Sequence, residues 1–161
     1  MNLTQLQNGS IKLKNDRPDI YKDTLNQSIP FFSLHKILYE KGNDLISNRY
    51  KLNQTDLDVL ATLYTLGENE YTLSPTTLYE KLLFSSGGMT KILKKLELDG
   101  LIRRIENDKD KRSKLVQLTS KGKEKALEAL NDVLTLEDKY FSKLDENERE
   151  VLTKLLHKII D

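Results

Sequence analysis

The spacing of hydrophobic positions along the chain predicts a mainly helical protein. Residues near one helical face in the segment after Pro30 are Phe31, Leu34, Ile37, Leu38, Leu45 and Ile46. Similar spacing recurs in residues 52–67, 73–83, 84–100, 119–141 and 145–160. Residues 1–17 are polar without a clear period and are expected to form a disordered arm. A short helix is expected to start at Pro18, because proline suits a first helical turn.

Local start and stop signals bound the predicted helices. Asn53 is followed three residues later by Asp56, which is the spacing of a capping box. Asp145 and Glu148 repeat that spacing before the last segment. The other predicted N-caps are Ser74, which precedes a proline, and Thr119, and the predicted stops are Gly67 and Gly100.

Two short segments alternate in polarity and predict a β-hairpin. They are LIRRIE (101–106) and KLVQLT (114–119), and a polar loop joins them. The loop has seven residues, five of them charged, whereas a hairpin needs only about two to five. A hairpin that follows helix–short turn–helix is the outline of a winged helix-turn-helix.

The predicted fold class is therefore mainly α with a small β-hairpin (α+β). The helices at both ends have apolar faces that one chain offers little to cover, so a homodimer is expected. The predicted organisation is a disordered arm (1–17), N-terminal dimerisation helices (18–50), a winged helix-turn-helix DNA-binding domain (51–119) and C-terminal dimerisation helices (120–161).

The positive charge of the chain is concentrated in one contiguous quarter. The formal net charge is only +1, but residues 85–125 hold 12 of the 26 Lys/Arg and 6 of the 25 Asp/Glu. The remainder of the chain is net acidic. A local excess of this kind is typical of a surface that meets a polyanion, and double-stranded DNA is the predicted partner.

The segment SSGGMTKILKK is the predicted recognition helix for the major groove. Two glycines in its first turn cost about 1 kcal/mol each in helix stability, which close approach to DNA would explain. The alternative is that its lysines only solvate a surface helix. The predicted DNA-binding residues in this helix and the preceding one are Ser74, Thr76, Thr77, Ser85, Ser86, Gly87, Gly88, Thr90, Lys91, Lys94 and Lys95.

The hairpin loop is the second part of the predicted DNA-binding surface. Its candidates are Lys109, Asp110, Lys111, Arg112 and Lys114. The planar, weakly hydrated guanidinium of Arg112 suits a narrow and electronegative minor groove. Asp110, two residues earlier, is expected to fix the tip and orient Arg112. The alternative is a solvated charged turn.

Several other classes of function have no support in the sequence. There is no cysteine and there are only two histidines, so no metal site and no cofactor are predicted. No phosphate loop, nucleophile elbow or catalytic triad spacing is present, and an enzyme is not expected. Neither a signal peptide nor a membrane helix is predicted, so the protein is expected to be soluble and cytoplasmic.

The hairpin and helix-turn-helix residues together resemble those of the MarR family of transcriptional regulators. DKRSKLVQLTSKG (110–122) is similar to the family's Asp-x-Arg wing and its Leu-Thr-x-x-Gly signature. LSPTTLYEKLLFSSGGMTKILKKLELDGLIRR (73–104) resembles its helix-turn-helix. The resemblance implies a homodimeric repressor of a pseudopalindromic operator. It also implies release from DNA by a small aromatic or phenolic acid bound between the dimer helices and the DNA-binding lobe.

Five residues are candidates for lining that effector pocket. Four lie on helices that would bound it, namely His35, Tyr39, Arg49 and Tyr64. The fifth, Asp58, resembles an acidic position of the family's urate-responsive branch. That branch also uses a tryptophan and an arginine, and this chain has no tryptophan and has Lys91 in the arginine's place. The alternative function is a winged-helix protein–protein interaction module without sequence-specific DNA binding.

Overall fold

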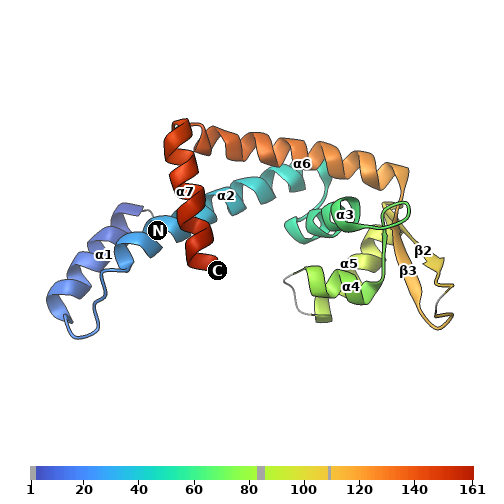
Figure 1. The fold of residues 1–161 in the computed structure, drawn as a ribbon, viewed down its shortest axis with the longest axis horizontal. Helices are drawn as coiled ribbons and strands as arrows, with labels where there is room; N and C mark the ends of the chain where they lie inside the picture. Colours follow the sequence, from blue (N-terminus) through green and yellow to red (C-terminus); the bar gives the residue numbers. More distant parts are fainter. Residues whose placement is uncertain (1–2, 83–85, 109) are drawn as a thin grey trace. The chain divides into compact units, whose positions relative to one another are not determined.

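The computed structural model describes residues 3–82, 86–108 and 110–161, without the side chains of residues 86 and 87. The chain divides into two compact units, residues 1–42 and 43–161, and each is described separately. Helices dominate, and the strands form one small antiparallel sheet (Figure 1), so the predicted mainly helical fold class with a winged helix-turn-helix is confirmed. Within the described residues, no helix is long and apolar enough to span a membrane.

The first unit contains a helix where a disordered arm was expected. Helix α1 (Leu3–Asp16) precedes α2 (Leu25–Tyr50), which continues into the second unit. Leu6 and Leu13 are half-buried seven residues apart on one face of α1, an apolar stripe too sparse to be recognised in the sequence. The expectation for residues 3–16 was therefore wrong.

The expected helix start at Pro18 was also wrong. Residues 18–20 form a turn, and α1 ends before them at Asp16. A residue that precedes proline is disfavoured in the α conformation, which accounts for the stop. Arg17 and Asp19 bridge this turn with an ion pair of 2.7 Å, and α2 begins at Leu25, earlier than predicted from Ser28-Ile29-Pro30.

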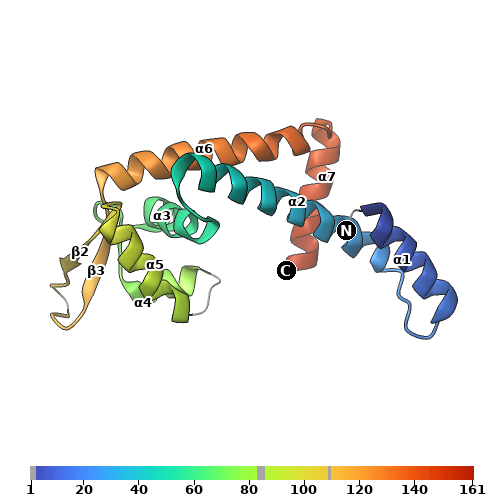
Figure 2. The same cartoon turned by 180° about the vertical axis from the view of Figure 1, so that it is seen from behind.

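The second unit contains the helix-turn-helix and its wing (Figures 1 and 2). After the end of α2 follow α3 (Gln54–Leu66), β1 (Thr72–Leu73), α4 (Pro75–Lys81), α5 (Ser86–Leu98), β2 (Ile102–Glu106), β3 (Lys114–Leu118), α6 (Ser120–Phe141) and α7 (Glu146–Ile160). The sheet has the order β1-β3-β2, and both pairings are antiparallel. Strand β1 was not predicted, because two residues are too few to show alternation.

The core of the second unit lies between α3, α4, α5, the sheet and the first turns of α6. Its largest fully buried side chains include Leu57, Leu60, Leu63, Leu78, Met89, Leu93, Leu96 and Val116. The spacing of Met89, Leu93 and Leu96 directs one face of α5 inward and leaves the opposite face to solvent. This core fixes α5 against the rest of the second unit.

The predicted N-caps are confirmed. Asn53 and Asp145 each form a reciprocal capping box with the acidic residue three positions later. Ser74 caps α4, with its hydroxyl oxygen accepting from the Thr77 N–H at 3.0 Å. The Thr119 hydroxyl oxygen likewise accepts from the Gly122 N–H at 3.0 Å and so starts α6 at the end of the wing.

Gly122 allows α6 to approach the wing closely. A Cβ atom at this position would overlap the carbonyl oxygen of Leu101 and touch Leu118. Thr119 adds a hydrogen bond of 2.8 Å from its hydroxyl to the carbonyl oxygen of Gly100. The Leu-Thr-x-x-Gly sequence is thus a packing element that joins α6 to both strands of the wing.

Candidate nucleic-acid interface

The outer face of α5 carries exposed cations. Thr90, Lys91 and Lys94 are exposed, and they alternate with the buried residues that fix the helix. Gly88 is also exposed, and the only neighbour that an added Cβ would meet there is the tip of Ile92 at 3.9 Å. An exposed, basic and sterically open face is what a helix needs in order to lie against a polyanion.

Lys95 differs from these lysines. Its ammonium group forms an ion pair with the carboxylate of Asp56, which is completely buried at the start of α3. The same Asp56 oxygen accepts from the Asn53 N–H at 2.9 Å, while its other oxygen has no hydrogen-bond partner. Lys95 therefore ties α5 to α3, and its charge is largely compensated within the protein.

The beginning of α4 offers less than its sequence indicates. Thr76 is exposed, but Ser74 and Thr77 are half-buried and bonded to each other, with 2.8 Å between their hydroxyl oxygens. Both hydroxyls support the N-terminus of α4. Of the three predicted DNA-binding residues here, only Thr76 presents its side chain fully to solvent.

The wing tip is organised by Asp110. Its carboxylate accepts from the backbone N–H of Arg112 at 3.0 Å, and its carbonyl oxygen accepts from the N–H of Ser113 at 3.0 Å. Asn107 closes the loop with a hydrogen bond of 2.9 Å to the Ser113 hydroxyl. Asp110 therefore shapes the backbone of the tip through its hydrogen bonds.

The remaining wing candidates are exposed. Lys111, Arg112 and Lys114 all present their side chains to solvent. Ser85 and Lys109 lie outside the described residues, as do the side chains of Ser86 and Gly87. Exposed members of the predicted DNA-binding set thus occur on both α5 and the wing, which belong to one unit.

The five candidate effector residues fall in both units of the chain. His35 and Tyr39 belong to the first unit, where their rings stack with centroids 6.1 Å apart. Arg49, Asp58 and Tyr64 belong to the second unit. No single described cavity contains all five, and none of them lines the 630 Å³ pocket at the base of the wing.

Arg49 and Tyr64 each have a partner within the second unit. Arg49 forms an ion pair of 2.7 Å with Asp132 on α6, and the Tyr50 hydroxyl donates to the same carboxylate at 2.7 Å. Burial raises the pKa of the Tyr50 phenol, and the Asp132 carboxylate adds to this effect. Tyr64 stacks on Tyr71 with 5.3 Å between the ring centroids.

Asp58 is half-buried on α3 beside Gln54. Burial raises the pKa of the Asp58 carboxyl above its ordinary value, and a hydrogen bond of 3.0 Å from the Gln54 side chain partly opposes this. A half-buried carboxyl with a raised pKa is a candidate for contact with a ligand, but structural carboxyls show the same property.

Among the described residues, no group of three His, Asp or Glu side chains is arranged to hold a metal ion. The sequence did not single out Arg103, Lys121 or Lys123, three cations that line the pocket at the base of the wing. Their only signal was the general excess of positive charge between residues 85 and 125.

Comparison with known proteins agrees with this geometry. Residues 50–113 match the sequence profile of the MarR family. The chain is 29% identical to the HTH-type transcriptional regulator PecS of Dickeya dadantii, over 91% of this chain and 87% of PecS. It is 34% identical to the HTH-type transcriptional regulator YkoM of Bacillus subtilis, over 70% of each protein.

Solved structures share the fold. The transcriptional regulator BldR from Sulfolobus solfataricus is 28% identical with a TM-score of 0.68, covering 86% of this chain and 94% of BldR. A MepR–DNA complex from S. aureus is 21% identical with a TM-score of 0.71, covering 83% and 95%. An organohalide-sensing regulator in its 2,4-dichlorophenol bound form is 17% identical with a TM-score of 0.72, covering 89% and 83%.

The last two structures establish similarity of fold alone, whereas the sequence relatives establish the family. Its members are DNA-binding transcriptional regulators and not enzymes. The protein belongs to the MarR family of winged helix-turn-helix transcriptional regulators.

Proposed function

We propose that the protein is a homodimeric repressor that binds a pseudopalindromic operator and is released from it by a small aromatic or phenolic acid. Each protomer inserts α5 into a major groove and places Arg112 of the wing in the adjacent minor groove. Two such lobes read half-sites about one helical turn, roughly 34 Å, apart.

The observation that carries the DNA-binding part is the pairing of an exposed basic helix with a preshaped wing tip in one compact unit. Lys91 and Lys94 extend from α5, and Arg112 extends from a loop whose backbone Asp110 fixes. The cations supply phosphate contacts, which position the protein, and the first turns of α5 read base edges. MepR, which shares this fold, has been crystallised with DNA.

The exposed apolar surface of α7 supports the homodimer. None of its residues is buried, and Val151, Leu155, Ile159 and Ile160 are 54%, 52%, 79% and 82% exposed. Four large aliphatic side chains along one 15-residue helix form an apolar surface of the kind that a soluble monomer rarely exposes. A second copy of the same helix would cover it, and the amphipathic face predicts a symmetric contact.

Release by a ligand requires that the ligand bind one arrangement of the two lobes better than the other. The candidates His35, Tyr39, Arg49, Asp58 and Tyr64 combine aromatic, cationic and hydrogen-bonding groups, which suit an aromatic acid. A structural relative that is organohalide-sensing was solved with a chlorinated phenol. This likeness supports an aromatic effector for the present protein.

Fluorescence anisotropy on labelled duplexes that tile the region upstream of the protein's own gene tests this function. The expected result is tight binding to one tile that survives an excess of random duplex. Arg112→Ala should weaken binding to that tile by about tenfold or more. Lys139→Ala, which removes an exposed charge from the far end of α6, is the matched control and should not.

Equal binding to every tile, or an unchanged affinity of the Arg112 variant, would contradict the proposed role of the wing. Light scattering tests the dimer separately, since a monomer at micromolar concentration would refute it. Ligand release is then tested by adding substituted benzoates and phenols to the complex with the best tile, and a rise in the dissociated fraction is expected.

A further inference from the structure

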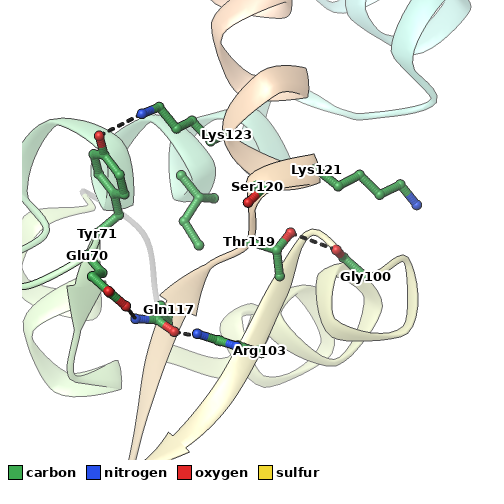
Figure 3. Close-up of a pocket in the computed structure, with 10 residues that line it drawn as sticks. Glu70, Tyr71, Gly100, Arg103, Gln117, Thr119, Ser120, Lys121 and Lys123 are labelled. Carbon is green, nitrogen blue, oxygen red and sulfur yellow. Dashed lines mark hydrogen bonds between the residues drawn. The ribbon is translucent and has the colours of Figure 1, made fainter.

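A pocket of about 630 Å³ opens at the root of the wing (Figure 3). It is bounded by the loop before β1, by the paired strands β2 and β3, and by the first turn of α6. These segments all belong to the second unit of the chain. The volume is sufficient for a small organic molecule.

Three cations line this pocket, and each is bound to a neutral acceptor. The Arg103 Nε–H donates to the Gln117 side-chain oxygen at 2.5 Å, and the Lys121 ammonium donates to the Asp99 carbonyl oxygen at 2.8 Å. The Lys123 ammonium donates to the Tyr71 hydroxyl at 2.7 Å. Among the described residues, none of the three cations has a carboxylate within ion-pair distance.

The pocket holds one opposing carboxylate, that of Glu70. Its Oε2 atom accepts from the Gln117 side-chain nitrogen at 3.1 Å, so Gln117 stands between Glu70 and Arg103 (Figure 3). Gln117 itself is only 4% exposed and uses both ends of its amide in this way. The formal charge of the lining is therefore three positive against one negative.

Two further features favour an anion at this position. Helix α6 has 22 residues and begins at the pocket, and a helix N-terminus carries a partial positive charge with unpaired N–H groups. The hydrogen bond to the Tyr71 hydroxyl raises the pKa of the Lys123 ammonium group above its ordinary value. The Lys123 ammonium also lies 4.6 Å from the centre of the Tyr71 ring, so a cation–π contact helps to hold it in place.

The pocket lies away from the surface proposed to contact DNA. It adjoins Gly100, which follows the C-terminal end of α5, whereas the basic residues proposed to enter the groove come earlier in that helix. On the wing, the root is marked by the pairing of Ile102 with Leu118, and the tip lies beyond the pairing of Glu106 with Lys114. The charge in the pocket is thus not accounted for by the DNA interface.

We propose that this pocket binds a small, multiply charged oxyanion, whose phosphate or carboxylate oxygens accept hydrogen bonds from Arg103, Lys121 and Lys123. The class includes phosphorylated small molecules and di- or tricarboxylates. This site differs from the effector pocket of the proposed function and does not depend on it.

Isothermal titration calorimetry at constant ionic strength tests the proposal, with inorganic pyrophosphate and citrate as the two probes and acetate as a singly charged, non-aromatic reference. The full chain should bind at least one multiply charged probe more tightly than acetate. A stronger response to pyrophosphate would indicate a phosphorylated ligand, and a stronger response to citrate would indicate a polycarboxylate.

Variants locate the binding. Lys123→Gln and Arg103→Gln should each weaken it by about tenfold or more, because each removes a charged hydrogen-bond donor. Glu70→Gln should instead tighten it, because the substitution removes the one opposing charge and keeps an acceptor for Gln117. A gain of affinity cannot arise from misfolding, so this variant keeps the test decisive.

The charge-matched controls are Lys139→Gln, which lies on α6 like Lys123 but away from the pocket, and Lys94→Gln, which lies on α5. The proposal is overturned if neither multiply charged probe binds better than acetate, or if Lys94→Gln weakens binding and Lys123→Gln does not. It is also overturned if Lys123→Gln lowers the salt dependence of DNA binding as much as Lys94→Gln, because the pocket would then be a DNA-backbone contact.

Discussion

The ion pair between Lys95 and Asp56 predicts an asymmetric response to mutation. The side chain of Asp56 is completely buried, whereas that of Lys95 is 42% exposed. If Asp56 loses its charge, Lys95 can turn into water at little cost. If Lys95 loses its charge, the Asp56 carboxylate stays buried, and the Asn53 N–H is then its one donor among the described residues. The two single variants should therefore differ in stability, although they remove the same interaction.

The magnitudes follow from these surroundings. Removing one partner of a buried pair costs about 3–5 kcal/mol, and the partial exposure of Lys95 places Lys95→Met near the lower end of that range. Asp56→Asn keeps an acceptor for the Asn53 N–H. It should lower the free energy of unfolding by about 1–2 kcal/mol, mainly because the buried amide lacks hydrogen-bond partners for some of its atoms. The double variant removes the stranded carboxylate and should be more stable than Lys95→Met alone.

Urea denaturation followed by circular dichroism measures these three values, at one fixed protomer concentration because the stability of the proposed dimer would depend on concentration. The sign of the difference between the double variant and Lys95→Met is the decisive result. If the double variant is less stable than Lys95→Met, or if the two single costs simply add, Asp56 does not depend on Lys95 and the reasoning fails.

Three further predictions concern other parts of the second unit. Asp58→Asn should raise the free energy of unfolding near pH 7. Burial raises the pKa of the Asp58 carboxyl, so the folded state loses stability as the pH rises from the pKa of the unfolded chain through the pKa of the folded chain. In urea titrations at several pH values, the gain should therefore vanish below about pH 4. In anisotropy titrations of DNA binding, Lys94→Gln should reduce the slope of log affinity against log salt concentration by about 0.9. Lys95→Gln should leave that slope nearly unchanged, because Lys95 is paired with Asp56. Equal changes in the two variants would contradict this assignment of the ion pair. Gly122→Ala should lower the melting temperature sharply, because the added Cβ atom meets the backbone carbonyl oxygen of Leu101. Gly42→Ala, where the added Cβ atom has open space, should be neutral or stabilising. Similar melting temperatures for the two variants would refute this account.

The local features of the fold could be predicted because their causes are local. A capping residue and its partner lie three positions apart, so Asn53 and Asp145 identify helix starts without tertiary information. The two wing strands show alternation over five residues each, which is enough for recognition. Helix α5 could be predicted because its buried positions, such as Met89 and Leu93, follow the helical period.

Features that depend on tertiary contacts were missed. Strand β1 is two residues long and exists because it pairs with β3, which is more than 40 residues away. The loop before it contains three consecutive non-glycine residues with positive φ, namely Asn69, Glu70 and Tyr71. Two backbone hydrogen bonds between Glu68 and Thr72, of 3.1 and 2.8 Å, close this loop, and no turn motif in the sequence indicates it. The pocket at the wing root includes Glu70 and Tyr71 from this loop.

Lys95 shows how the same limit affects a site prediction. In the sequence it lies beside Lys94 on a basic helix, and nothing within the helix distinguishes the two residues. The difference comes from Asp56, 39 positions earlier, whose role as a helix cap places its carboxylate under α5. A basic cluster therefore contains both cations that stabilise the fold and cations that are available to a ligand. The two kinds can be told apart only by the residues with which they pair in the structure.

The same criterion connects the two proposed binding surfaces of the second unit. Lys95 has a buried carboxylate as its partner, so its charge serves the fold. Within the described part of the chain, Arg103 and Lys123 have only neutral partners, so their charge remains available to an anion that enters the pocket. Because Arg103 and Gln117 are paired residues of the wing strands, an anion held there would contact the element that carries Arg112. The wing is then a segment through which a bound small anion and a bound operator could affect each other.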